Sequence, residues 1–416
     1  MTAVSAEPGV NASAVPAAPP RRSRSGFGAA VFAFLIVMAV ATLPSPLYGL
    51  YRVRDNLSAL TITVVFAIFA ASTIAVLRLD SAIVARIGRR GAMLSAVATM
   101  MVAVGVLAAW KDLPGLLIGR LITGVSVGLA AGTAITYLIE LRLRADPKAS
   151  PVRARTIGTS VTVGALGVGP LIGGCLAQWA AQPLTVPYLV FLALGAIALI
   201  GLRAAPETGA PARGGAPATG RKPAGPRRKA RLPVPAAAGT LAAFAANGLF
   251  AGLSGLFLAT TLHHPSHALS GAALFILFSC GVLSQLATLK ASRVLALGMS
   301  SMLAGLVLLV VSVRLSVPDL AMFLIGGALI GAGSGAVFKG TTGIVLEASP
   351  PESRVAMTSD LLIALYVGLS VPVIGAGIAL SAGASAPSTV LGFAILVGLA
   401  VVVSGWALLG RRQVRP

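Results

Sequence analysis

Three charged residues lie inside or beside long apolar stretches of this sequence. Arg120 is in LLIGRLITGVSVGLAAGTAITYLIE, Lys339 is in LIGGALIGAGSGAVFKGTTGIVLE, and Asp360 directly precedes LLIALYVGLSVPVIGAG. Each stretch is long enough to cross a bilayer as a helix, since about 20 apolar residues span its hydrocarbon core. Charges in such positions are costly, and where they occur they mark substrate sites, ion sites or proton pathways. We therefore expect these residues to bind a charged group or exchange a proton.

Lys339 and Asp360 are expected to reach similar depths in neighbouring antiparallel helices. Lys339 lies about 12 Å along a helix axis from Glu347, and Asp360 lies about 9 Å from Arg354, near the same end. As a pair, the two charges would neutralise each other in an apolar environment. A static ion pair and a pair that switches during proton transfer both remain open. A lysine that extends towards the membrane interface is a further alternative.

Other polar groups carry weaker signals. Asn247 lies in the middle of FAANGLFAGLSG, where its amide could hydrogen-bond to a neighbouring helix or contact a substrate, and both interpretations stay open.

His263, His264 and His267 cluster in one loop without an acidic or thiol partner, so we expect no metal site there. No phosphate-binding loop of the form G-x-x-x-x-G-K-[ST] is present, so ATP hydrolysis is not expected to drive the protein. We expect no cofactor.

The helix that carries Arg120 has glycines at four-residue spacing. Gly124 and Gly128 follow the arginine on one helix face, where they would allow the backbone of a neighbouring helix to approach closely. The stretch ends with Glu140, as the corresponding stretch in the second half of the chain ends with Glu347. This correspondence predicts an internal repeat of membrane helices, an arrangement common in secondary transporters.

The next apolar stretch has a proline within a run of glycines. Its residues Gly169, Pro170, Gly173 and Gly174 should bend the helix and leave a close-packing surface. The segment VGPLIGG aligns with SVPVIGA in the second half, which superposes Pro170 on Pro372. The repeat therefore extends over at least two consecutive helices.

Composition and hydropathy predict an all-α membrane protein of twelve transmembrane helices in two six-helix bundles. The chain has 416 residues, of which 56% are hydrophobic and 10% charged, unlike an ordinary soluble domain. Apolar segments of spanning length occur at 27–49, 57–77, 91–110, 114–139, 157–179, 184–203, 236–258, 268–289, 294–313, 318–345, 356–380 and 389–409. The expected organisation is a disordered cytoplasmic tail (1–26), a first bundle (27–203), a basic cytoplasmic linker (204–235), a second bundle (236–410) and a cytoplasmic tail (411–416).

The basic residues predict the orientation of the chain. With both termini in the cytoplasm, the outer loops hold only Arg52, Arg54, Lys111 and Arg314 of the 32 lysines and arginines. This distribution follows the positive-inside rule. The net charge of +21 is then explained by topology and by contact with anionic lipid headgroups, so we expect no nucleic-acid partner.

The loop after the second predicted helix resembles a signature of the major facilitator superfamily. That signature is Gly-x-x-x-Asp-Arg-x-Gly-Arg-Arg, and its second half is matched here by Arg86, Gly88, Arg89 and Arg90. In the first half, Ser81 replaces the glycine and Ala85 replaces the aspartate, which in the family helps to hold an inner gate shut. Whether Asp80 takes over the gating role of the missing aspartate stays open. The positive-inside rule alone could also explain the arginines.

Other motifs strengthen the resemblance. Arg120 with Gly124 and Gly128 resembles the fourth-helix signature of the superfamily, whose arginine is implicated in coupling. The Gly169-Pro170 motif resembles the fifth-helix signature of its proton-coupled exporters, and Pro206-Glu207-Thr208 resembles a sequence that follows its sixth helix. The resemblance implies alternating access of two bundles around a central site, and it implies no covalent chemistry.

We therefore predict a transporter, and not an enzyme. The favoured function is export of small organic molecules, drugs or metabolites, from a bacterial cell in exchange for protons, by a monomer in the plasma membrane. Arg120 and Lys339 against a single acid, Asp360, favour an alternative, import or exchange of organic anions. A membrane sensor or scaffold without transport activity is a third alternative, although no soluble signalling domain is visible in the sequence.

Overall fold

The computed structural model describes residues 20–208, 232–315, 317–350 and 353–413, and no strand occurs among them. Twelve helical segments in this part of the chain are long and apolar enough to cross a membrane, which confirms the predicted fold class. The elements are α1 (Pro20–Val40), the 3-10 helix η1 (Ser45–Leu47), α2 (Tyr48–Asp55), α3 (Ala59–Ala109), α4 (Leu113–Ala145), α5 (Pro151–Trp179), α6 (Val186–Arg203), α7 (Val234–Thr260), α8 (His267–Gln285), α9 (Ala291–Arg314), α10 (Leu320–Ala348), α11 (Arg354–Ser381) and α12 (Ala386–Gln413).

Helix α3 contains two of the predicted spans. The segments Ala59–Leu79 and Ala82–Ala109 are each long enough to cross a membrane, and helical turns continue through the connection between them. Gly88, near the start of the second segment, interrupts the helix with φ 75° and ψ 175°. A positive φ costs glycine little because it has no Cβ, so Gly88 is the residue at which the chain changes direction.

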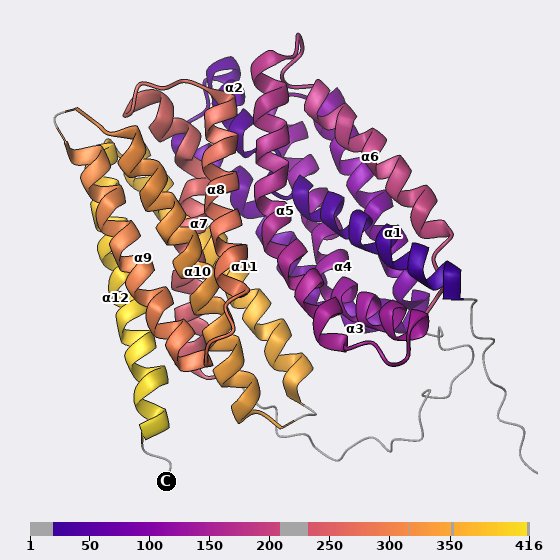
Figure 1. Cartoon of the computed structure of the whole chain (residues 1–416). Coiled ribbons are helices and arrows are strands. Elements are labelled where there is room, and N and C mark those ends of the chain that lie inside the picture. The colour runs from indigo at the N-terminus through magenta and orange to yellow at the C-terminus, as the bar shows by residue number, and fades with distance from the viewer. Residues whose placement is uncertain (1–19, 209–231, 316, 351–352, 414–416) are drawn as a thin grey trace, which may run out of the picture.

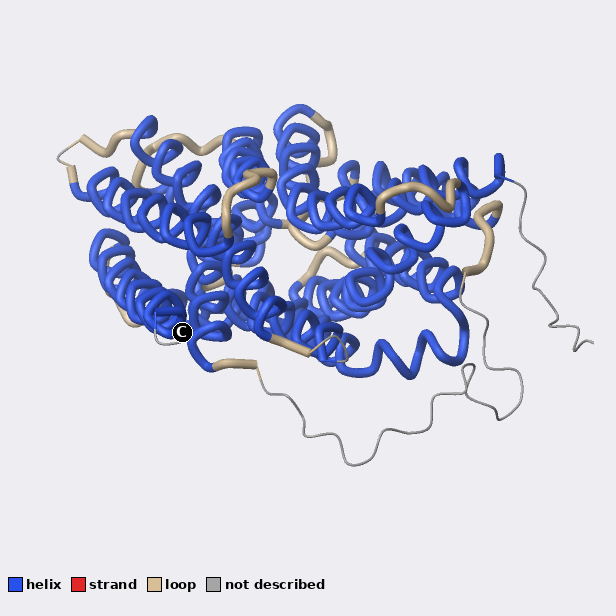
Figure 2. Tube along the Cα trace, turned by 60° about the horizontal axis from the view of Figure 1, so that its bottom comes forward, coloured by secondary structure: helices blue, strands red, loops and turns tan. Residues whose placement is uncertain are grey.

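The helices form two bundles, α1–α6 and α7–α12 (Figure 1). Two seams join them. Helix α5 packs against α8, and the first half of α3 packs against α11. Figure 2 shows that short loops connect most of the helices within each bundle. We call the end where α6 ends and α7 begins the linker end, and the opposite end, where α2 lies, the far end (Figure 1).

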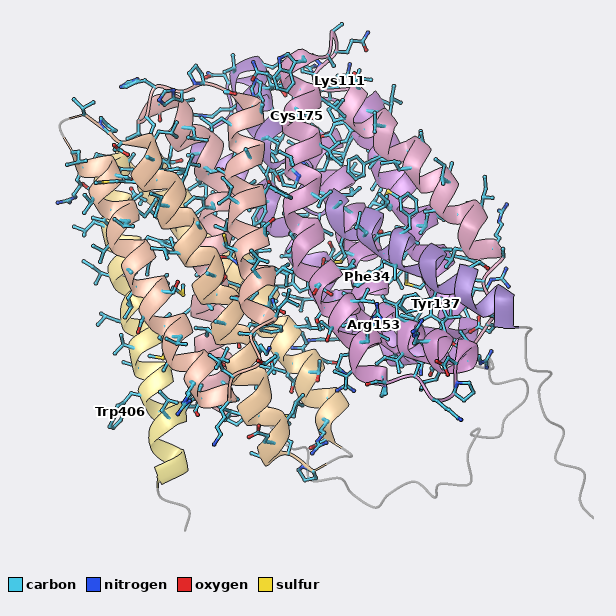
Figure 3. All side chains as sticks on the ribbon, in the orientation of Figure 1. Phe34, Lys111, Tyr137, Arg153, Cys175 and Trp406 are labelled. Atoms are coloured by element: carbon cyan, nitrogen blue, oxygen red, sulfur yellow. The ribbon has the colours of Figure 1, made fainter. Side chains whose placement is uncertain are left out.

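The outer surface of the bundles suits a lipid environment. Trp406 projects outwards from α12 (Figure 3), with 78% of its surface exposed. Leu396 and Ile200 are similarly exposed. Lys111 lies at the far end, whereas Arg153 lies towards the linker end (Figure 3). An apolar belt between charged ends is the pattern of a membrane-spanning protein.

The helices at the two termini extend further than hydropathy indicated. Helix α1 begins at Pro20, within the tail expected over 1–26, and α12 continues to Gln413, within the tail expected from 411. Hydropathy marks where apolar residues end, whereas a helix can continue through polar residues beyond the membrane boundary. Residues 1–19, most of the predicted linker (209–231) and residues 414–416 lie outside the described part of the chain.

Candidate functional site

Arg120 lies in the interior of the first bundle. Its side chain is fully buried, and its Nη1 donates a hydrogen bond of 2.7 Å to the carbonyl oxygen of Ala41, at the end of α1. Its Nε and Nη2 have no hydrogen-bond partner among the described residues. A buried guanidinium is costly when its donors are unpaired, so these two nitrogens can bind an acceptor on a substrate or on water.

Two aromatic rings of α3 face this guanidinium. The Cζ atom of Arg120 lies 4.4 Å from the centroid of the Phe69 ring and 5.8 Å from that of Phe66. Cation–π attraction of this kind contributes about 2 kcal/mol at a desolvated site. The edge of Phe69 also meets the ring of Tyr366 on α11, with a centroid separation of 6.1 Å. Arg120 is thus connected through Phe69 to the other bundle, which sequence reasoning missed.

Two tyrosines, Tyr48 and Tyr188, interact electrostatically with Arg120 on the side towards the far end, and Tyr51 contacts Tyr188. The hydroxyl groups of Tyr51 and Tyr188 are 3.2 Å apart and form a hydrogen bond. Tyr48 is also buried, and its hydroxyl has no partner among the described residues. The first bundle therefore contains a cation with hydroxyl and aromatic neighbours, a combination that can bind an anionic or hydrogen-bond-accepting group.

The predicted close packing beside Arg120 is confirmed. A Cβ atom added at Gly124 would clash with the backbone oxygen of Phe69, and one at Gly128 would come within 2.7 Å of the Val76 Cβ. Thr73 on α3 donates from its hydroxyl to the carbonyl oxygen of Gly124 over 3.1 Å. Close approach of α4 to α3 is what holds Phe69 against the arginine.

The internal repeat is visible in the packing of the second bundle. On α10, Cβ atoms added at Gly331 or Gly335 would clash with the α8 backbone, which matches the packing of Gly124 and Gly128 against α3. The repeat position of Arg120 is Gly327, where the Phe250 ring would lie 3.0 Å from an added Cβ. The two bundles thus share a backbone arrangement, and the first contains a cation where the second contains an aromatic ring.

The glycines of α5 allow close packing of other helices on two sides of it. Cβ atoms added at Gly169 or Gly173 would clash with α1, at Ala39, and with the segment that follows it, at Leu43, respectively. On the other side, an added Cβ at Gly174 would clash with the α8 backbone. The carbonyl oxygen of Pro170 faces Gly271 on α8 in the same way. The motif therefore provides the close-packing surface expected from its sequence, and this surface lies at the boundary between the bundles.

Polar contacts between the bundles are found at the far end of both seams. On one seam, the Oε1 atom of Gln178 accepts a hydrogen bond of 2.9 Å from the backbone nitrogen of His267, whose Nδ1 lies 3.2 Å from the Pro46 carbonyl oxygen. On the other seam, the backbone nitrogen of Leu60 donates to the Ser381 hydroxyl over 3.1 Å. These contacts hold the far ends of the bundles together.

At the linker end, the arginine-rich motif binds two carboxylates. Glu207 accepts hydrogen bonds from the backbone nitrogens of Arg89, at 3.0 Å, and Arg90, at 3.1 and 3.2 Å. Because Gly88 breaks α3, these are free donors at the start of a helix, where a carboxylate is favourable. The Nε of Arg89 and the Oε2 of Glu140 form an ion pair at 2.7 Å, with angles outside the hydrogen-bond range. A Cβ at Gly88 would lie 2.8 Å from Glu207.

The other residues of this motif differ in how much they contact the rest of the protein. Arg86 is exposed, and the side chain of Asp80 lies outside the described part of the chain. Tyr137 and Arg144 on α4 donate hydrogen bonds to backbone oxygens of the Pro206-Glu207 segment. Glu140 and Glu207 therefore supply the carboxylates in this region, where the superfamily signature would supply an aspartate.

The expected pairing of Lys339 with Asp360 is wrong. The Nζ atom of Lys339 donates to the carbonyl oxygens of Gln285 and Ala287, at the end of α8, and among the described residues no ion pair joins it to Asp360. The last carbonyls of a helix lack partners within the helix and carry partial negative charge, so they attract a nearby ammonium group. Asp360 is exposed, two turns into α11.

Asn247 joins two helices of the second bundle. Its Nδ2 donates to the Ser334 hydroxyl of α10 over 3.0 Å, which confirms the helix-linking interpretation. Its Oδ1 is buried without a hydrogen-bond partner among the described residues. The amide can therefore still accept a hydrogen bond from a bound molecule, and the substrate-contact interpretation stays a prediction.

Comparisons with known proteins agree with this architecture. Residues 26–313 match the Major Facilitator Superfamily. A search of curated protein sequences found no match. One similar solved structure is a crystal structure of a point mutant of the nucleoside transporter NupG, with a TM-score of 0.68 over 93% of this chain and 99% of that chain. The sequence identity is 9%, so this likeness shows the fold alone.

Proposed function

Because this chain belongs to the Major Facilitator Superfamily, we propose that it is a secondary transporter that exports small organic molecules across a bacterial plasma membrane in exchange for protons. The two bundles would rock around a central site, so that the site opens to one side of the membrane at a time. The residues proposed to act on the substrate are Arg120 and Asn247, each buried with unpaired polar atoms.

The hydrogen bonds between the bundles are concentrated at one end, which supports the alternating-access part of this proposal. The hydrogen bonds that join them, including Gln178–His267 and Leu60–Ser381, lie at the far end. Towards the linker end, the helices of the two bundles diverge (Figure 1). The basic loops support the proposal that the linker end lies in the cytoplasm, as the positive-inside rule predicts. The conformation would then be closed to the outside, which is the state in which an exporter loads its substrate and an importer releases it.

The direction of transport and the coupling ion rest on sequence. The Gly169-Pro170 motif, which resembles that of proton-coupled exporters, packs at the seam that must open and close. Asp360 is the proposed proton carrier, because its exposed carboxyl group can exchange protons with water at the linker end. Arg86, Arg89, Arg90 and Glu140 are proposed to act in the gate at that end.

A second candidate is exchange or import of organic anions. The observation that favours it is the fully buried Arg120 with Nε and Nη2 unpaired, next to hydroxyl groups and aromatic rings. Guanidinium groups suit the planar, two-oxygen geometry of carboxylates. The fold likeness to a nucleoside transporter adds an uncharged nucleoside to the substrates that should be tested.

Transport into proteoliposomes separates these functions. The substrates compared are a permanently cationic dye, an aromatic carboxylate and radiolabelled uridine, each with an acidic lumen, with an alkaline lumen and with no gradient. Proton-coupled export predicts accumulation of the dye in vesicles with an acidic lumen, because protons leave as substrate enters. A permanent charge prevents passive trapping of the dye.

Two controls are protein-free vesicles and vesicles treated with a protonophore. Accumulation of the carboxylate with an alkaline lumen, as for entry together with protons, would support the second candidate and overturn the first. If none of the three substrates is transported against its gradient, both candidate functions are contradicted.

A further inference from the structure

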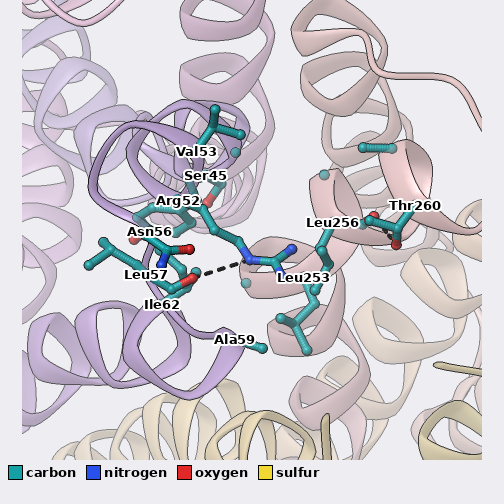
Figure 4. Close-up of a pocket in the computed structure, with 15 residues that line it drawn as sticks. Ser45, Arg52, Val53, Asn56, Leu57, Ala59, Ile62, Leu253, Leu256 and Thr260 are labelled. Carbon is teal, nitrogen blue, oxygen red and sulfur yellow. Dashed lines mark hydrogen bonds between the residues drawn. The ribbon is translucent and has the colours of Figure 1, made fainter. Parts of the chain in front are cut away.

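A cavity of about 320 Å³ lies at the far end, between the two bundles (Figure 4). One wall comes from η1, α2 and the start of α3, and the other comes from α7. Cavities that hold small molecules begin at about this size. Its position at the far end separates it from the motif at the linker end, and it shares Tyr48 with the surroundings of Arg120.

Arg52 places a cation in this cavity. Its Nε donates a hydrogen bond of 3.3 Å to the Leu57 carbonyl oxygen, and its guanidinium group points across the cavity towards α7 (Figure 4). The nearby acidic residues, Asp55 and Asp112, form ion pairs with Arg54 and not with Arg52. Arg54 lies 3.5 Å from Asp55 and 2.8 Å from Asp112. Arg52 itself forms no ion pair within the described part of the chain, so its charge is available to a ligand.

Two residues whose hydroxyl groups are buried border the same space. Tyr48 is 3% exposed and Ser45 is 5% exposed, and neither hydroxyl has a hydrogen-bond partner among the described residues. Ser45 lies on η1 and Tyr48 on α2, so both belong to the first bundle, whereas Leu253 and Leu256 line the cavity from α7 of the second bundle.

Aliphatic side chains form part of the lining, and a second hollow lies next to the cavity. Ile62 on α3 and Leu253 and Leu256 on α7 present aliphatic surface. A second hollow of about 330 Å³ shares Arg52 and Leu256 and extends to Ser381, at the end of α11. The cationic side chain thus borders both spaces, and the second space offers a route to the far-end surface.

We propose that this cavity is a binding site for an organic anion with an apolar body. Arg52 would bind the carboxylate, and the aliphatic side chains of Ile62, Leu253 and Leu256 would contact its body. Because such a ligand touches both bundles, it stabilises the state that is closed at the far end. The site goes beyond the proposed transport function, because binding can be measured without any transport.

The test uses 4-benzoylbenzoate, a photoreactive aromatic carboxylate, with the full chain purified in detergent. Crosslinked peptides are identified by mass spectrometry, and its uncharged amide, 4-benzoylbenzamide, is compared as a competitor. We expect crosslinks to the α7 segment Leu253–Thr260 and competition by the amide that is about tenfold weaker or more, since charge-assisted hydrogen bonds are the stronger ones.

The variant Arg52→Gln should lower the apparent affinity for 4-benzoylbenzoate about tenfold or more. The matched control is Arg54→Gln, two residues away on α2, whose side chain binds Asp112 and does not line the cavity. A second variant, Ala259→Phe, keeps the charge and fills the space, and it should abolish crosslinking to α7. If Arg52→Gln does not fold, this variant and the amide comparison decide the question. Equal affinity of Arg52→Gln and the parent, equal competition by acid and amide, or crosslinks confined to other helices would overturn the proposal.

Discussion

The guanidinium carbon of Arg120 lies 4.4 Å from the centroid of the Phe69 ring, which links the buried charge of one bundle to the other bundle. The same ring meets Tyr366 edge-on across the seam between α3 and α11. When the bundles rock, the Phe69–Tyr366 contact must change. A change in Phe69 is then transmitted to Arg120, so binding at the arginine and the conformation of the seam are expected to influence each other.

The first prediction concerns Arg120. The variants Arg120→Ala and Arg120→Lys should both lose transport, the lysine variant by about tenfold or more, because an ammonium group does not reproduce the planar guanidinium over an aromatic ring. Transport rates in proteoliposomes measure the effect. The exposed Arg314→Ala is the control and should transport normally. Normal transport by the lysine variant would show that only a positive charge is needed here.

The second prediction concerns the packing of α4 on α3. Gly124→Ala should lower the thermal unfolding midpoint in detergent and impair transport, because the added Cβ would clash with the Phe69 backbone, and overpacking costs about 1–3 kcal/mol. Gly124→Leu and Gly128→Leu should abolish transport. The matched control is Gly105→Ala on α3, where an added Cβ meets nothing within 4 Å. A Gly124→Ala protein as stable as the Gly105→Ala protein would contradict the packing argument.

The third prediction concerns the prolines of α5 and α11. Replacing Pro170 and Pro372 together with alanine should shift the balance between inward-open and outward-open states, because each proline lies in a seam helix. A single reporter cysteine at Ala259, in a background with Cys175 and Cys280 replaced by serine, reports opening of the far end through its labelling rate. Identical labelling rates with and without the prolines would mean that these residues do not set the equilibrium.

The fourth prediction concerns proton coupling. Asp360→Asn should keep substrate binding and downhill exchange but lose accumulation driven by a pH gradient, because the amide cannot release a proton at this position. The measurement compares accumulation with counterflow in the same vesicles. Lys339→Met is a useful comparison, because this lysine binds the end of α8 and should affect stability more than coupling. Uphill transport by Asp360→Asn would place the proton pathway elsewhere.

Several features followed from sequence because they depend on neighbouring residues along the chain. The twelve spans follow from runs of apolar residues whose length matches the bilayer. The glycines at 124 and 128 identified a close-packing face, since residues four apart lie on one side of a helix. The break at Gly88 was part of a recognised motif, although its positive φ was visible only in the structure.

The sequence by itself therefore determined which segments cross the membrane, which helix faces pack closely, and which residues bring charge into the bundles. Only the tertiary structure decided what each charge meets. Lys339 binds carbonyl groups at the end of α8 instead of Asp360, Arg120 meets the Ala41 carbonyl oxygen and the Phe69 ring, and Glu207 caps the helix that follows Gly88. The physical reason is that the electrostatic environment of a buried group is supplied by whichever elements pack around it, and hydropathy and residue spacing along one helix do not specify those neighbours.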